Sequence, residues 1–207
     1  MRKLFEIGGL VAAVVLIAFG IGALVMGVNG RSTVRDNLAQ EQISFGDAAK
    51  DPTVPKQYSG ELDNTGDKAR AFANMMRGHT LEATKGLTYA QMGRFEAKPG
   101  APAKATDGQG GTNDPAYAAT DPQTKQPVSN PARNIWVTET GLTTALNTAY
   151  MAERISVFGI VVGIALLLTG FGFAILAIGG ALRNPDTALG FAKKRGKTHK
   201  ASAAPTA

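Results

Sequence analysis

Two long apolar runs frame a polar middle segment in this chain of 207 residues. The first run covers residues 7–28 and the second covers residues 155–182, and neither contains a charged side chain. A helix needs about 20 predominantly apolar residues to cross a hydrocarbon core about 30 Å thick. Both runs exceed that length, so the pattern predicts two transmembrane helices joined by the polar segment 31–154.

Small residues recur at spacings of four and seven along both runs, which places them on one face of each predicted helix. These positions are Gly9, Ala13, Gly20 and Gly27 in the first run and Gly159, Gly163 and Gly170 in the second. Lipid gives little hydrophobic drive between helices, so small residues stabilise packing by letting two backbones approach closely. The simpler expectation is an antiparallel hairpin within one chain, and the alternative is a homo-oligomer through the Gly159–Gly163 pair.

The polar segment begins with a helical periodicity that continues the first apolar run to about Gly46. The prolines of the DPTVP sequence then end that helix, because proline lacks the backbone donor that a helix needs. A second helix is predicted to start near residues 64–67, where Asn, Thr and Asp are all suitable caps. It places Phe72, Met76 and His79 on one face.

Residues 98–133 are rich in Pro, Gly, Ala, Asp and Thr, which predicts a flexible loop without a core of its own. A helical stripe then leads from Ile135 into the second apolar run. Trp136 would stand about 28 Å above that run on a continuous helix, too far for an interfacial aromatic belt. It is expected to pack against Phe72 or Met76, in preference to serving as a ligand platform.

These elements together predict an all-α membrane protein. It has two antiparallel transmembrane helices, a small helical extracytoplasmic domain and a flexible loop within that domain. A partner is expected to contact the domain at Phe72, Met76, His79 and Trp136.

The charge distribution orients the predicted spans. The net charge is +6, from 22 Lys and Arg against 16 Asp and Glu. Residues 31–154 hold fourteen of each sign, so the whole excess lies in the tails 1–6 and 183–207. The positive-inside rule therefore predicts a cell-membrane protein with both termini in the cytoplasm. The first run is too long for the core of a signal peptide and no A-x-A site follows it, so an uncleaved anchor is expected.

The C-terminal tail carries a polybasic cluster that includes Lys193, Lys194 and Arg195. Such clusters attract anionic lipid head groups, although a signal that fixes topology is explanation enough. Nucleic acid is not an expected partner, because no aromatic residues interleave with these cations.

The chain has no cysteine and two histidines, His79 and His199, which restricts its chemistry severely. On the predicted topology the two imidazoles lie on opposite sides of the membrane, so a two-histidine iron site cannot form within one chain. No catalytic or nucleotide-binding motif occurs, and no enzymatic activity, metal or cofactor is expected. His79 precedes Glu82 by three residues on a helix, which leaves an acid–base pair or a ligand site open as the alternative.

Two segments carry a resemblance: GDKARAFANMMRGHTLEATKGLTYAQMGRF and ARNIWVTETGLTTALNTAYMAERISVFGIVVGIALLLTG. They resemble an uncharacterised family of two-span membrane proteins from actinobacteria. Members of that family are often labelled aromatic ring-opening dioxygenases, and the histidine content of this chain gives that label no support. The resemblance implies a location and a topology but no activity.

The leading hypothesis is a non-enzymatic scaffold or accessory subunit, which presents the extracytoplasmic domain to a partner in the cell envelope. The alternative is a membrane-anchored ligand-binding or enzymatic module that uses His79 and Glu82.

Overall fold

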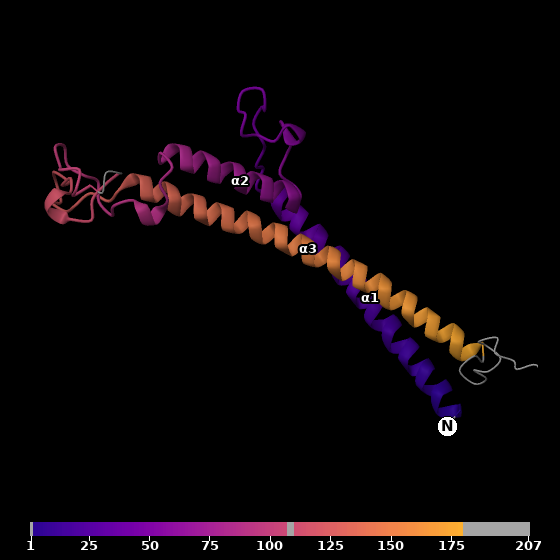
Figure 1. Cartoon of the computed structure of the whole chain (residues 1–207). Coiled ribbons are helices and arrows are strands. Elements are labelled where there is room, and N and C mark those ends of the chain that lie inside the picture. Colours follow the sequence, from indigo (N-terminus) through magenta and orange to yellow (C-terminus); the bar gives the residue numbers. More distant parts are fainter. Residues whose placement is uncertain (1, 107–109, 180–207) are drawn as a thin grey trace, which may run out of the picture. The chain divides into compact units, whose positions relative to one another are not determined.

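The computed structural model describes residues 2–106 and 110–179 (Figure 1). Three α-helices account for most of them: α1 (Arg2–Gln40), α2 (Gly66–Ala83) and α3 (Pro131–Ile178). Short 3₁₀ turns occur at Lys56–Tyr58, Tyr89–Gln91 and Pro115–Tyr117. Pairing of extended segments within the described residues is limited to isolated bridges, so the described fold is all-helical, as predicted.

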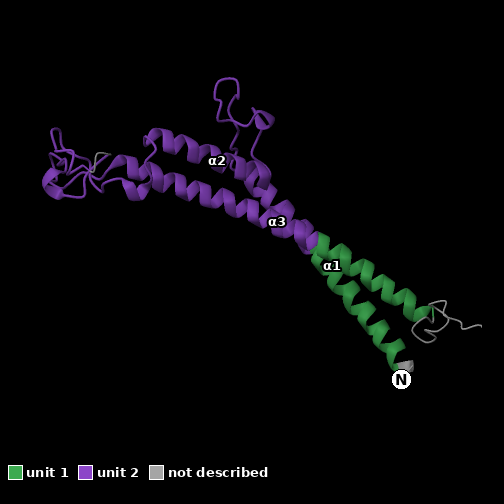
Figure 2. Cartoon of the chain, in the orientation of Figure 1, with its two compact units in different colours: residues 1–25, 161–207 green, residues 26–160 purple. Residues whose placement is uncertain are grey.

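The chain divides into two compact units (Figure 2). Unit 1 comprises residues 1–25 and 161–207, and unit 2 comprises residues 26–160. The division falls inside both apolar runs, so unit 2 contains the polar segment 31–154 together with one end of each run.

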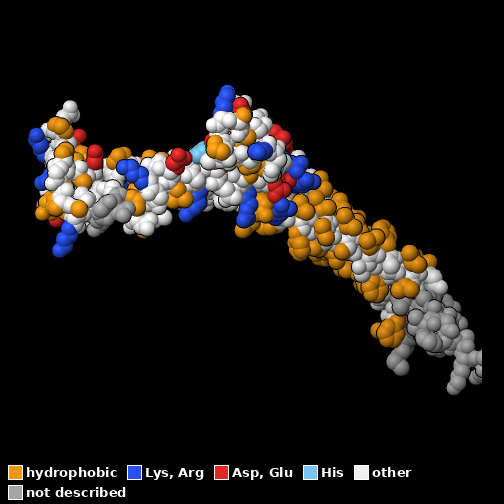
Figure 3. Space-filling view, turned by 45° about the horizontal axis from the view of Figure 1, so that its top comes forward, with side chains coloured by type: hydrophobic (Ala, Val, Ile, Leu, Met, Phe, Trp, Pro, Cys, Tyr) orange, Lys and Arg blue, Asp and Glu red, His pale blue; other side chains and the backbone are white. Residues whose placement is uncertain are grey.

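Helices α1 and α3 each contain one apolar run, and both are long and apolar enough to cross a membrane. Only 17% of the most apolar window of each helix is buried by the rest of the chain. Large hydrophobic side chains such as Phe19, Phe158 and Leu168 are exposed, and Figure 3 shows the hydrophobic surface that such side chains form. A core helix of a water-soluble protein would be buried, so these helices differ from that class.

In unit 1, the two helices pack antiparallel through their small residues. A Cβ atom built on Gly20 would lie 3.0 Å from the carbonyl oxygen of Gly163. One built on Gly163 would lie 2.8 Å from the backbone nitrogen of Leu24, and one on Gly170 would lie 2.7 Å from Cγ1 of Ile17. Such distances are too short for a side-chain carbon, so this close approach requires glycine.

The other predicted packing positions also lie toward the partner helix or close to it. Gly9 and Ala13 are buried in unit 1, and Gly159 is half-buried in unit 2. In unit 2, a Cβ atom on Gly27 would lie 2.7 Å from the carbonyl oxygen of Ser156. Because Gly163 already contacts α1 within the chain, the geometry favours the hairpin over the Gly159–Gly163 homo-oligomer.

In unit 2, α2 packs on α1 and α3 through a core that contains Leu38, Ala69, Ala73 and Leu146. Thr65 is the N-cap residue of α2, and its Oγ1 accepts a hydrogen bond from the backbone N–H of Lys68. This resolves the three capping candidates in favour of the threonine.

The C-terminal ends of α1 and α2 are set by residues with positive φ. Helix α1 ends at Gln40, earlier than the predicted Gly46, because Gln42 adopts a left-handed conformation with φ 53° that a helix cannot contain. Helix α2 ends at Ala83, and the N–H of Gly86 (φ 81°) donates to the carbonyl of Leu81 at 2.7 Å. That bond closes a Schellman-type cap.

Residues 41–65 connect α1 to α2 and form a loop that we call the strap. Its two ends pair with each other near the helices. The N–H of Phe45 donates to the carbonyl of Glu61 at 2.9 Å, and the N–H of Asp63 donates to the carbonyl of Ile43 at 2.7 Å. The strap therefore has a closed base.

The strap covers one face of α2. Phe45 and Val54 of the strap are buried together with Met75 of α2 in a second apolar core. Phe72 joins this core, because its ring meets the ring of Phe45 edge to face with centroids 5.3 Å apart. The predicted helix face thus packs inside the unit.

Residues 84–130 form a distal lobe between α2 and α3. Its extended segments pair at Phe95 with Thr112 and at Ala97 with Ala118. The predicted flexible loop, 98–133, overlaps this lobe, and its described residues include paired backbone and buried residues, Thr112 and Ala118 among them. Composition did not reveal this, because backbone pairing and not a large apolar core holds the segment.

Asn130 joins the distal lobe to α3. Its Nδ2 donates to the carbonyls of Gly93 (2.9 Å) and Gly110 (2.6 Å), and its Oδ1 accepts from the N–H of Ala132 (3.0 Å). Pro131, the first residue of α3, follows it. A single amide therefore caps the helix and fixes two loop segments.

Candidate functional site

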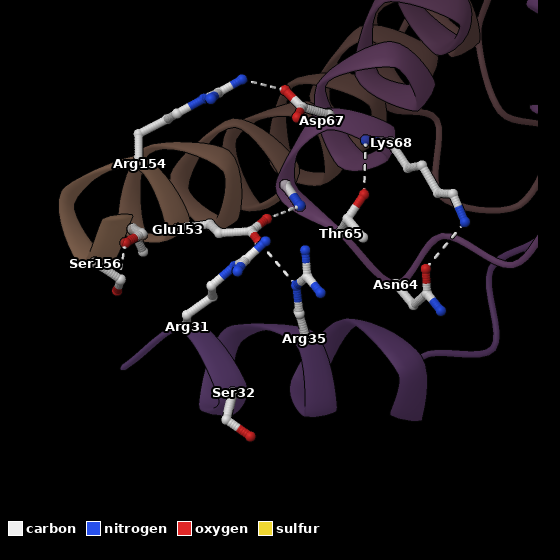
Figure 4. Close-up of polar contacts among 12 residues, drawn as sticks. Arg31, Ser32, Arg35, Asn64, Thr65, Asp67, Lys68, Glu153, Arg154 and Ser156 are labelled. Carbon is white, nitrogen blue, oxygen red and sulfur yellow. Dashed lines mark hydrogen bonds and ion pairs between the residues drawn. The ribbon is translucent and has the colours of Figure 1, made fainter. Parts of the chain in front are cut away.

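A polar cluster lies where α1, α2 and α3 meet in unit 2, beside the ends of the apolar runs (Figure 4). Its centre is Glu153 of α3, whose side chain is 9% exposed. One carboxylate oxygen, Oε1, accepts from Nε of Arg31 at 3.0 Å and from Nε of Arg35 at 2.8 Å. The other, Oε2, accepts from the backbone N–H of Gly66, the first residue of α2. One carboxylate thus ties three helices together.

The pKa of Glu153 reflects this balance. Burial acts to raise it, but the N–H of Gly66 and the two guanidinium groups stabilise the carboxylate, and the net effect lowers the pKa. The position of Gly66 at the start of α2 adds the positive end of a helix dipole. A Cβ atom on Gly66 would lie 2.8 Å from Oε2, so glycine is needed for this approach.

A second, exposed pair lies beside the first. Arg154 binds the carboxylate of Asp67, and both side chains are more than half exposed. The guanidinium groups of Arg154 and Arg70 lie over the ring of Tyr150, 5.1 Å and 4.8 Å from its centroid. Exposed pairs of this kind contribute little to stability, so Glu153 carries most of the electrostatic effect.

The pattern of the sequence does not by itself predict this cluster. Its members come from positions 87 to 122 residues apart in the chain. A signal was present nevertheless: Arg31 and Arg35 follow the first apolar run, and Glu153 precedes the second. In an antiparallel hairpin, those positions reach the same depth.

His79 has other partners than the predicted one. Its Nε2 lies 3.0 Å from Oδ2 of Asp51 and 2.7 Å from Oγ1 of Thr53, both on the strap. Glu82 is exposed, and its carboxylate has no recorded bond to the imidazole among the described contacts. The strap, not the next turn of the helix, therefore supplies the acid.

Trp136 is buried, as a packing role requires, but its contacts differ from the predicted ones. Its Nε1 donates to the carbonyl of Leu87 at 2.8 Å and lies 3.3 Å from Oγ1 of Thr84. The guanidinium of Arg77 lies 5.0 Å from the indole centroid. The register explains the difference: Leu146 packs at the middle of α2, so Trp136, ten residues earlier on α3, lies at the C-terminal end of α2.

We expect Trp136→Phe to destabilise unit 2 by about 1–2 kcal/mol. The ring volume is largely kept, but the Leu87 carbonyl loses its donor in a buried setting. The measurement is urea unfolding in detergent, followed by far-ultraviolet circular dichroism because the variant lacks the only tryptophan. An unchanged midpoint would show that the indole N–H contributes nothing to stability. Val137→Ala, at an exposed neighbour, is the control and should leave the midpoint unchanged.

Of the four predicted partner-contact residues, none presents a free apolar surface. Trp136 is buried, Phe72 and Met76 are partly buried against the apolar cores, and His79 is bonded to the strap. These residues therefore contribute to packing within unit 2, and a partner contact at them stays a prediction.

An apolar groove is present on unit 2, between α1 and α3. It has a volume of about 470 Å³, and Val34, Leu38, Ile43, Leu142 and Ala145 contribute to its lining. The groove lies on the segments of α1 and α3 that directly continue the apolar runs.

No group of three or more metal-ligating side chains occurs among residues 2–106 and 110–179. Lys193, Lys194 and Arg195, the predicted lipid-binding cluster, lie outside the described residues. Comparison of the chain with protein-family models, with curated proteins and with solved structures finds no match, so its function has to be inferred from this geometry.

Proposed function

We propose that this chain is a two-span cell-membrane protein with both termini in the cytoplasm, and that it is a scaffold or accessory subunit without enzymatic activity. In this proposal α1 and α3 anchor the chain, and unit 2 presents a helical domain to a membrane or envelope partner on the outer side.

The observation that carries the membrane proposal is the exposure of both apolar helices. In each helix, only 17% of the most apolar window is buried. Their glycine-mediated packing supports two permanent spans, because a cleaved signal segment would not need a matched partner helix. The Arg31, Arg35 and Glu153 cluster supports a boundary at that depth, since charged groups are costly inside the hydrocarbon. The basic excess of the two tails supports the orientation.

The scaffold proposal is supported by the apolar groove between α1 and α3, which lies on the polar side of that boundary. A helix that emerges from the same membrane would run alongside α1 and α3 and meet the groove with its apolar face. We therefore propose a membrane protein with an apolar juxtamembrane helix as the partner.

A photo-crosslinking amino acid at Ala145, in the groove, is expected to give a discrete adduct in native membranes. The matched control is the same crosslinker at the exposed neighbour Thr144, which does not line the groove. The partner is identified by mass spectrometry, and Ala149→Arg should then abolish the adduct by placing a charge in the groove. Equal adducts from positions 144 and 145 would refute the groove as the contact surface.

The alternative module based on His79 and Glu82 loses its geometric support, because the imidazole is bonded to Asp51 and Thr53. No observation among the described residues favours it over the scaffold.

A further inference from the structure

The carboxylate of Asp63 is an unusual feature at the base of the strap. The residue is fully buried, and neither of its carboxylate oxygens has a hydrogen-bond partner among the described residues. An ionised carboxylate is costly in such surroundings. Burial accordingly raises the pKa of Asp63 to about 6, and the positive charge of Lys68 offsets only part of this effect.

The charged groups near Asp63 are already engaged with other partners. The ammonium of Lys68 lies 3.0 Å from the carbonyl of Leu62, 3.0 Å from Oδ1 of Asn64 and 2.9 Å from the carboxylate of Glu61. The charged groups that α1 and α3 bring to this end of α2 bind each other: Arg31, Arg35 and Glu153. None of these contacts satisfies the Asp63 oxygens.

A second polar contact holds the strap further along α2. Thr53 donates its hydroxyl proton to Oδ1 of Asp51 at 2.6 Å, so its oxygen must accept from His79. Nε2 of His79 is therefore the protonated nitrogen, and it is shared between Thr53 and Asp51.

The other charged groups near this contact do not compete for the imidazole. Asp47 and Lys50 of the strap pair with each other at 3.9 Å. Glu82, on the same helix, is exposed.

We propose that the strap is a pH-sensitive cover, which stays docked on α2 while the buried carboxyl of Asp63 is neutral and which is released as that carboxyl loses its proton. Release would uncover the apolar face of α2 beneath it, formed by Ala71, Phe72, Met75 and Met76. The inference goes beyond the proposed function and does not depend on it, because docking of the strap is a property of unit 2 alone.

The direction follows from linkage. The docked state holds the Asp63 proton more tightly than the released state, whose carboxyl has an ordinary pKa near 3.8. Docking therefore weakens as the pH rises from about 4 to about 6 and then levels off. A difference of about two pH units corresponds to about a hundredfold change in the opening equilibrium.

The carboxylate of Asp51, which contacts Thr53 and His79, does not contribute to this pH dependence. Asp51 stays ionised throughout this range. The side chain of Thr53, its backbone N–H and His79 lower the pKa of Asp51, and together they outweigh its slight burial.

The experiment uses the full chain in detergent. The chain has no native cysteine that would react with the reagent. Val54→Cys places a thiol under the strap, where Val54 is 3% exposed, and Lys56→Cys places one on its exposed surface. A pyridyl disulfide reagent, which reacts in acid as well, measures both rates from pH 4 to 8. The rate for Val54→Cys divided by the rate for Lys56→Cys reports opening of the strap. We expect this ratio to rise at least tenfold between pH 4 and 7.

Four further variants separate the causes. Asp63→Asn mimics the neutral acid and should keep the Val54→Cys thiol protected at pH 7. His79→Gln should raise the ratio at pH 5, whereas Glu82→Gln, the matched control on the same helix, should not. Ala73→Cys, in the core between the three helices, should stay protected at all these pH values, which separates strap release from unfolding of the unit.

Ala48→Cys, partly buried in the same core, provides a second reporter if Val54→Cys perturbs the strap. A rate ratio that is independent of pH for both reporters would overturn the proposal. A pH dependence that survives Asp63→Asn would overturn the role of Asp63, and an unchanged ratio in His79→Gln would overturn the role of His79.

Discussion

Replacing Glu153 with alanine is expected to destabilise unit 2 by about 3 kcal/mol. The substitution leaves two guanidinium groups without their shared carboxylate and the N–H of Gly66 without its acceptor. Removing one partner of a buried, hydrogen-bonded charge costs about 3–5 kcal/mol. The lower end applies here, because Arg31 and Arg35 are 44% and 40% exposed and recover part of their hydration.

The single tryptophan makes this measurement direct. Trp136 is 4% exposed and lies in the same unit as Glu153, so urea unfolding in detergent can be followed by its fluorescence. Arg154→Gln is the matched control, because Arg154 is the next residue in the chain and its ion pair with Asp67 is exposed. Its midpoint should stay close to that of the unmodified chain. Equal midpoints for Glu153→Ala and the unmodified chain would refute the central role of the carboxylate.

Glu153 also predicts a pH dependence with a definite sign. Its pKa is lowered in the folded state, so its stabilising effect is present above the ordinary glutamate range and is lost as the pH falls through the lowered value. Glu153→Gln retains an acceptor for Gly66 but has no charge to lose. Its stability should therefore lack this acid-dependent component.

The helices were predictable from sequence because their signals are local. The apolar runs and the seven-residue spacing of small residues, such as Ala13 and Gly20 in one run and Gly163 and Gly170 in the other, depend only on residues within a few turns of one another. The geometry of the hairpin then follows from two such faces, since close approach of backbones needs small residues on both.

The polar sites were not predictable in the same way, because their partners come from distant segments. His79 was paired with Glu82 on the same helix, but the strap brings Asp51 to it from 28 positions away. Glu153 depends on residues from three helices. A comparison of depths along the predicted hairpin would have placed Glu153 near Arg31, but only the fold adds Gly66.

The distal lobe shows a further limit of composition. Residues 98–133 contain few large apolar side chains, and their fold depends on backbone pairing and on buried polar groups such as Thr112. The Asn130–Pro131 pair was a usable signal, because asparagine before proline is typical of a helix start. It would have extended the predicted helix upstream and shown where the lobe is attached.

Replacing Gly163 with leucine is expected to separate α1 from α3 in unit 1. The first carbon of any side chain at this position would lie 2.8 Å from the backbone nitrogen of Leu24 and 2.9 Å from the carbonyl oxygen of Gly20. Backbone atoms cannot move aside as a flexible side chain can. Leucine favours helices and is apolar, so α3 itself and its partition into lipid should be unaffected.

The separation can be measured with one cysteine in a chain that otherwise has none. Ala13→Cys places a thiol at a position that is 1% exposed, on the face of α1 that meets Gly170. A lipid-soluble maleimide should label this thiol slowly in the parent chain and at least tenfold faster with Gly163→Leu. The reason is that overpacking, which costs about 1–3 kcal/mol, separates the packed faces of α1 and α3.

Gly172→Leu is the control that makes the result specific. It adds the same side chain about two and a half turns further along α3, where a Cβ atom meets nothing within 4 Å. Its labelling rate should equal that of the parent chain. Equal rates for the two leucine variants would mean that the packing of α1 on α3 in unit 1 does not depend on close approach of their backbones.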